Sequence, residues 1–77
     1  MEIQDFIAKF ADLFDSTGAD EITATTNFRE LDEWSSLIAL SAIVMIEDEY
    51  DVTIKGDDIR NSKTVEDLFN AVKGYKS

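Results

Sequence analysis

Residues 35–50 read SSLIALSAIVMIEDEY, and this stretch decides the fold. Its first three turns are apolar on nearly every side of a helix, and its last turn is acidic. A serine that precedes a helix accepts an N–H from the first turn, so we expect the helix to begin at Ser35 or Ser36, with Ser35 as the N-cap, and to end near Tyr50. A helix that is apolar on every side is normally surrounded by other elements, which favours a place at the centre of a bundle.

The apolar residues of this helix form two stripes on different faces. One stripe comprises Ala39, Ala42, Ile43, Ile46 and Tyr50, and the other comprises Leu37, Leu40, Ser41 and Val44 with Ile38 beside it. A small bundle cannot easily cover both stripes, so the second is either buried by a loop or left exposed for a partner. We predict a docking surface that contains Leu37, Leu40 and Val44.

Acidic residues follow the apolar part of the helix directly. Carboxylates at a helix C-terminus oppose the helix dipole, which suggests that they serve something other than the helix. The residues concerned are Glu47, Asp48 and Asp51, with Asp57 and Asp58 shortly after them; alternatively, the run is only a solvated face of the helix.

The segment before this helix predicts one long helix and one long connection. Residues 2–15 place apolar side chains at helical spacing, and the run 15–18 ends that helix with turn-forming residues. The connection from Gly18 to Trp34 is polar, so we expect it to be held down by its few apolar side chains, which are Ile22, Phe28, Leu31 and Trp34.

The segment after the helix predicts a connector and two further helices. Residues 51–54 read as an extended connector, and residues 56–62 as one short helical turn with Ile59 inward. The last helix is expected to open at Thr64 with a near capping box to Asp67 and to stop near Gly74. Its apolar stripe is Val65, Leu68, Phe69 and Val72. The predicted fold is all-α: one domain over residues 1–77, built as a small antiparallel bundle of three long helices and one short helix.

Composition excludes several classes of function. The chain has no cysteine and no histidine, which rules out disulfides and thiolate zinc sites and removes the usual general base. No nucleophile–base pair can be proposed, so we predict no catalytic residue, no enzyme activity and no metal site. The net charge of −10 repels nucleic acid and anionic membranes and attracts basic protein surfaces; alternatively, it only keeps a small monomer soluble.

The sequence gives no sign of membrane insertion or export. No basic stretch is followed by an apolar run of the kind found in secretory signals. The longest uncharged run, residues 34–46, is shorter than the roughly 20 residues that span a bilayer. We expect a cytoplasmic protein.

Two motifs together resemble the acyl and peptidyl carrier protein family. They are Leu31-Asp32-Glu33-Trp34-Ser35-Ser36-Leu37 and Ile46-Glu47-Asp48-Glu49-Tyr50-Asp51-Val52-Thr53-Ile54, and the similarity continues through Ile59 and residues 64–68. The resemblance implies 4′-phosphopantetheine, transferred from coenzyme A by a separate phosphopantetheinyl transferase to the serine that precedes a leucine, which is Ser36 here. An anion on Ser36 at a helix N-terminus would be favoured by free amides and the helix dipole.

The resemblance further implies the partners: the transferase, an acyl- or aminoacyl-loading enzyme and downstream synthase enzymes. The cargo classes that share this layout are fatty acyl, polyketide, aminoacyl and D-alanyl groups. The chain departs from the family in two places. Ser35 replaces the family's aspartate, a residue that the transferase is thought to use, and Ile38 and Ser41 stand where acids are common. The resemblance therefore implies a docking surface that is more hydrophobic than is usual, with its charge moved to Glu47, Asp48, Asp51, Asp57 and Asp58.

Two alternatives to a modified carrier come from other classes of protein. One is a carrier-like adaptor that is never modified and binds partners through the apolar face of residues 36–50. The other is a calcium-binding helix–loop–helix protein, but the required loop of oxygen ligands with a central glycine and a final glutamate does not occur.

Overall fold

The computed structural model describes residues 2–15 and 19–76, and within these ranges its regular secondary structure is entirely helical, with no strand. The four α-helices are α1 (Ile3–Ala11), α2 (Ser36–Tyr50), α3 (Gly56–Arg60) and α4 (Val65–Lys76), and the two short 3₁₀ helices are η1 (Ala19–Glu21) and η2 (Phe28–Glu30). The prediction of an all-α bundle of three long helices and one short helix is confirmed. The predicted turn at residues 16–18 lies outside the described residues.

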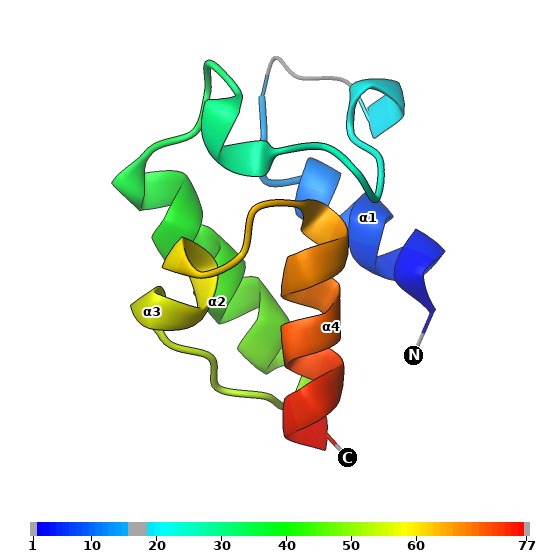
Figure 1. Ribbon diagram of the computed structural model, residues 1–77, viewed down its shortest axis with the longest axis vertical. Coiled ribbons are helices and arrows are strands. Elements are labelled where there is room, and N and C mark those ends of the chain that lie inside the picture. Colours follow the sequence, from blue (N-terminus) through cyan, green and yellow to red (C-terminus); the bar gives the residue numbers. More distant parts are fainter. Residues whose placement is uncertain (1, 16–18, 77) are drawn as a thin grey trace.

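Figure 1 shows how the helices are arranged. Helix α1 runs opposite to α2 and α4, while α2 and α4 run in the same direction, because the connection that contains α3 carries the chain back to the top of the bundle. Helix α1 packs against both α2 and α4, and α3 contacts α2 and α4. The start of α2 thus lies at one end of the bundle, between η2 and α3.

An aromatic cluster forms the centre of the core. Phe6 is fully buried, and its ring centroid lies 6.2 Å from Phe10, 5.8 Å from Tyr50 and 5.5 Å from Phe69. These contacts join α1 to both α2 and α4. Aromatic pairs at such separations add to the stabilisation that burial alone provides. The predicted inner stripe of α4 is buried in full, since Val65, Leu68, Phe69 and Val72 all belong to the core.

The long connection before α2 is held by the side chains that the sequence predicts. Ile22 and Phe28 are buried, and Leu31 and Trp34 pack half-buried against the core. The Phe28 ring lies 5.5 Å from Phe10 and 4.9 Å from Trp34. Phe28 therefore joins α1 to the segment that leads into α2, which fixes η2 and Trp34 beside the first turn of that helix.

Two predicted helix ends are wrong. Helix α1 ends at Ala11 instead of residue 15, because the amides of Leu13 and Phe14 bond three residues back, to Phe10 and Ala11, in a tighter turn that buries Phe14. Helix α4 continues through Gly74, the predicted stop, to Lys76.

Contacts from distant residues hold the last turn of α4 in place. The Tyr75 hydroxyl donates a 2.8 Å hydrogen bond to Asp58, and the Lys76 ammonium donates one of 2.8 Å to the Tyr50 carbonyl. The bond to Asp58 raises the pKa of Tyr75 above its usual value. These contacts tie the C-terminal turn to α2 and α3, so the helix does not stop at its glycine.

The predicted start of α4 is confirmed. The Thr64 hydroxyl accepts from the Asp67 amide at 3.1 Å, and the Asp67 carboxylate accepts from the Thr64 amide at 3.2 Å and the Lys63 amide at 3.1 Å. The two backbone donors hold the pKa of Asp67 below its usual value. This reciprocal capping satisfies amides that the helix itself leaves free.

The stability of the bundle is expected to rise with salt. The chain has seventeen acidic residues and seven basic ones, and salt screens the repulsion among the carboxylates. We expect the thermal midpoint to be several degrees higher in about 0.5 M sodium chloride or in millimolar magnesium than at low ionic strength. Circular dichroism during heating measures this. An unchanged or lower midpoint would show that repulsion does not limit stability.

Candidate functional site

Ser35 is the N-cap of α2, as predicted. It has extended backbone angles, φ −155° and ψ 172°, and its hydroxyl accepts a hydrogen bond from the Ile38 amide at 3.3 Å. The first backbone bond of the helix runs from the Ala39 amide to the Ser35 carbonyl at 2.9 Å. The amides of Ser36 and Leu37 come before that bond and have no partner within the helix, so they leave N–H groups at its positive end.

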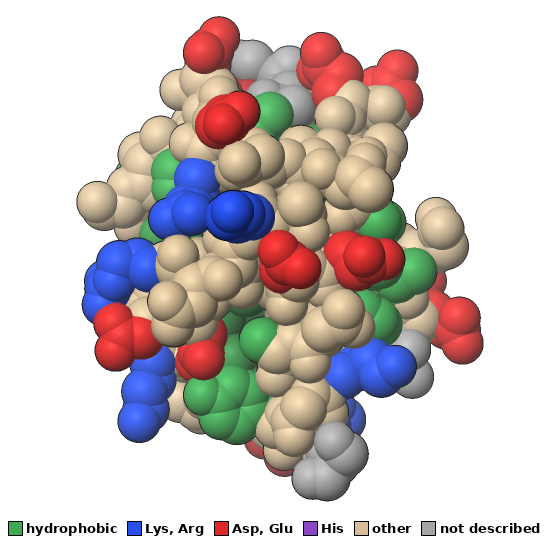
Figure 2. All heavy atoms as spheres, in the orientation of Figure 1, with side chains coloured by type: hydrophobic (Ala, Val, Ile, Leu, Met, Phe, Trp, Pro, Cys, Tyr) green, Lys and Arg blue, Asp and Glu red, His purple; other side chains and the backbone are tan. Residues whose placement is uncertain are grey.

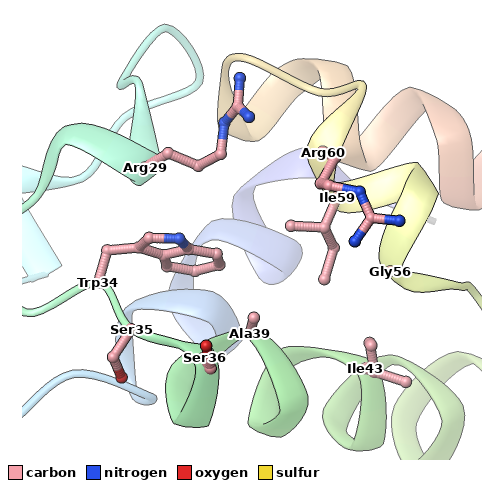
Figure 3. Close-up of a pocket in the computed structure, with 9 residues that line it drawn as sticks. All are labelled: Arg29, Trp34, Ser35, Ser36, Ala39, Ile43, Gly56, Ile59 and Arg60. Carbon is pink, nitrogen blue, oxygen red and sulfur yellow. The ribbon is translucent and has the colours of Figure 1, made fainter.

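Ser36 is the first residue of α2, and it is exposed. Its hydroxyl makes no hydrogen bond with any residue in the described ranges. In Figure 3 the Ser36 hydroxyl points toward Trp34 and the neighbouring pocket, whereas the Ser35 hydroxyl points away. The two adjacent serines therefore differ: the Ser35 hydroxyl caps the helix, and the Ser36 hydroxyl is accessible for reaction.

A pocket of about 410 Å³ lies beside Ser36. Three parts of the chain enclose it: the η2 region, the first two turns of α2, and α3. Its lining residues are Arg29, Trp34, Ser35, Ser36, Ala39, Ile43, Gly56, Ile59 and Arg60. Neither Arg29 nor Arg60 was predicted from the sequence as a site residue. They are 31 positions apart, by their residue numbers, and only the packing of α3 on α2 brings them to one pocket.

The second apolar stripe of α2 is exposed along Leu37, Leu40 and Val44, so the long connection does not bury these side chains. The exposed fractions are 72% for Leu37, 57% for Leu40 and 52% for Val44, and Ser41 is half-buried. Spacings of four residues place Ser36, Leu40 and Val44 on one face. The free hydroxyl and the exposed stripe therefore form one continuous strip along α2.

The predicted acidic residues lie at the far end of the same helix, and Glu47, Asp48 and Asp51 are all exposed. Glu47 accepts a 3.2 Å hydrogen bond from the Thr53 hydroxyl, and Asp51 ends the helix in the left-handed region at φ 56°. Within α3, Asp57 contacts Arg60, and Asp58 accepts from the Lys55 amide at 2.9 Å. Asp57 and Asp58 thus also support the local structure of α3.

The described residues contain no group of three or more acidic side chains arranged to hold a metal ion. Over the same part of the chain, no helix combines the length and the apolar character needed to cross a bilayer.

A comparison with protein families matches residues 4–72 to the family described as the phosphopantetheine attachment site. The chain belongs to this family. A carrier domain of the family holds 4′-phosphopantetheine covalently on a serine, so this chain is a phosphopantetheine carrier domain, as the resemblance implied. Searches of curated proteins and of solved structures gave no significant match.

The residues at the start of α2 fit this group. A phosphodiester needs an accessible hydroxyl and donors for its charge, and Ser36 offers a free hydroxyl next to unpaired amides at a helix N-terminus. When bound, the group supplies a thiol that carries cargo as a thioester, which explains how a chain without cysteine can act as a carrier.

Proposed function

We propose that residues 1–77 act as one discrete carrier domain that tethers acyl-type intermediates on a phosphopantetheine arm attached to Ser36. The observation that carries the proposal is the contrast between two adjacent serines at the start of α2. The Ser35 hydroxyl is engaged by the Ile38 amide, and the Ser36 hydroxyl is exposed and free of described partners. Ser36 is also the serine followed by a leucine, as in the family motif.

The proposed partners follow from this chemistry. A phosphopantetheinyl transferase installs the arm, a loading enzyme charges it with an acyl or aminoacyl group, and synthase enzymes use the cargo. The domain itself performs no catalysis in this proposal. Its role is to present Ser36 together with the exposed strip of α2, so that each partner meets the same surface.

Intact mass tests this function. The purified chain, incubated with coenzyme A and a broad-specificity phosphopantetheinyl transferase, should gain one phosphopantetheinyl group per molecule. A chain that stays unmodified with several transferases, although it remains folded by circular dichroism, would instead support the unmodified adaptor.

The exposed stripe of α2 is expected to dock partners. Leu40→Ser or Val44→Ser should weaken binding to the transferase roughly tenfold, because a central apolar contact of an interface contributes more than 1 kcal/mol. The unfolding free energy should stay within about 0.5 kcal/mol, since both side chains are more than half exposed. Titration with the transferase and urea unfolding measure the two quantities.

Ala8→Ser provides the matched control for this docking prediction. It adds a hydroxyl to an exposed position of α1, outside the strip, and should change neither quantity. A loss of about 2 kcal/mol in the Leu40 or Val44 variant, as for a core truncation, would show that the stripe is core and not a docking surface.

A further inference from the structure

The charged residues that line the pocket beside Ser36 are both arginines, although the chain as a whole is strongly acidic. Arg29 and Arg60 line it, and every other lining residue is uncharged. The chain has seventeen carboxylates and seven basic residues, so a pocket with two arginines and no carboxylate departs from the rest of the molecule. Figure 2 shows that most of the Lys and Arg side chains visible on this face lie on the side where Figure 1 places α3.

The two guanidinium groups are available to a ligand. Arg29 forms no ion pair or hydrogen bond with any residue in the described ranges. Arg60 contacts Asp57 within α3, but an arginine carries five N–H donors in a planar fork, so one contact leaves several of them free. In Figure 3, Arg29 lies above Trp34 with its guanidinium group turned away from Ser36, and Arg60 lies across the pocket from Ser36 and Trp34. Arg29 is exposed, so a change of rotamer can turn its guanidinium group toward the pocket.

We infer that this pocket binds an oxyanion tethered to Ser36 and that Arg29 and Arg60 hold it. The inference rests on the proposed attachment at Ser36. Guanidinium groups match phosphate and carboxylate oxygens well, and such charge-assisted bonds are about twice as strong as neutral ones. Two tethered anions have this chemistry: the phosphodiester of the arm, and a carboxylate at the end of a cargo.

The geometry favours the phosphodiester. Its phosphate is bonded to the Ser36 hydroxyl oxygen, and Ser36 itself lines the pocket. A cargo carboxylate sits at the other end of a long flexible arm, and the arm must fold back to bring it here. The amides at the start of α2 add donors of the same sign.

The test compares unmodified and modified forms of three proteins. They are the wild type, the Arg29→Gln/Arg60→Gln variant, and a matched Lys55→Gln/Lys63→Gln variant that loses the same charge from residues outside the pocket lining. Intact mass confirms modification before any other measurement. A wild-type protein that gains no mass would therefore contradict the attachment at Ser36. Only fully modified proteins are used to test whether the pocket binds the anion.

The first readout is the thermal midpoint at low salt. Modification should raise the midpoint of the wild type and of the lysine variant by roughly 4 °C, as new charge-assisted bonds do in a domain of this size. In the arginine variant the rise should fall to less than half of the wild-type value, because only the amides at the start of α2 then remain to offset the repulsion from the carboxylates of the chain. Molar sodium chloride should shrink the rise in the wild type.

The second readout is the fluorescence of Trp34, the only tryptophan in the chain, which lines the same pocket. Loading should shift its emission in the wild type and not in the arginine variant.

A third experiment separates the two sources of the anion, the phosphodiester and a cargo carboxylate. The arm is loaded with two acyl groups of equal length, one neutral and one ending in a carboxylate. An arginine-dependent change that appears only with the carboxylate assigns the site to cargo. The absence of any arginine-dependent change in all loaded forms overturns the inference.

Discussion

A Ser36→Ala variant is expected to gain no mass when it is incubated with coenzyme A and a phosphopantetheinyl transferase that modifies the wild type completely. The change removes the one hydroxyl at the start of α2 that is exposed and free of described partners. Alanine is a good helix former, so the first turn should remain intact. Intact mass measures modification, and circular dichroism shows that the variant is folded.

The matched control is Ser35→Ala, one residue earlier. It removes the hydroxyl that accepts from the Ile38 amide, so the variant should lose about 1 kcal/mol of unfolding free energy as an N-cap deletion. It should still be modified, though more slowly if the transferase contacts the side chain at this position. Full modification of Ser36→Ala together with none of Ser35→Ala would reverse the assignment.

A Phe28→Ala variant is expected to lose about 3–5 kcal/mol of unfolding free energy. Phe28 is fully buried and bridges Phe10 of α1 and Trp34 before α2, so its removal leaves a cavity between two elements. A domain of this size has only about 5–10 kcal/mol in total, so the variant should lose a large share of its stability. Urea unfolding followed by circular dichroism measures the loss.

Leu37→Ala is the matched control, since it also truncates a large apolar side chain. Leu37 is 72% exposed, so the change should stay within about 0.5 kcal/mol. Phe28→Leu keeps most of the buried volume and should retain a folded state in which an intermediate loss can be measured. If Phe28→Ala lost less than about 1 kcal/mol, the long connection would not be anchored through this ring.

Local patterns predicted most of the fold. The serine cap and apolar run gave the bounds of α2, and the reciprocal pair Thr64 and Asp67 gave the start of α4. These features depend on residues within one turn of each other, so they can be read from neighbours in the chain. The two wrong helix ends depend on packing: Phe14 turns into the core, and Tyr75 and Lys76 bond to residues 17 and 26 positions away.

The candidate site divides in the same way. Ser36 and the stripe of Leu37, Leu40 and Val44 lie on one helix, so helical spacing was enough to find them. Whether that stripe was covered could not be predicted, because this depends on the path of the long connection. The pocket with Arg29 and Arg60 arises from elements that are distant in sequence, and neither residue stands in a recognisable motif.

Localisation of the arm on the modified wild-type chain tests the central claim most directly. After loading from coenzyme A, the protein is digested, and tandem mass spectrometry of the peptide that contains Ser35 and Ser36 places the added group. We predict that C-terminal fragment ions that begin at Ser36 carry the whole mass increase and that those that begin at Leu37 carry none, which locates the arm on Ser36. An arm on any other serine, Ser35 and Ser41 included, would contradict this prediction.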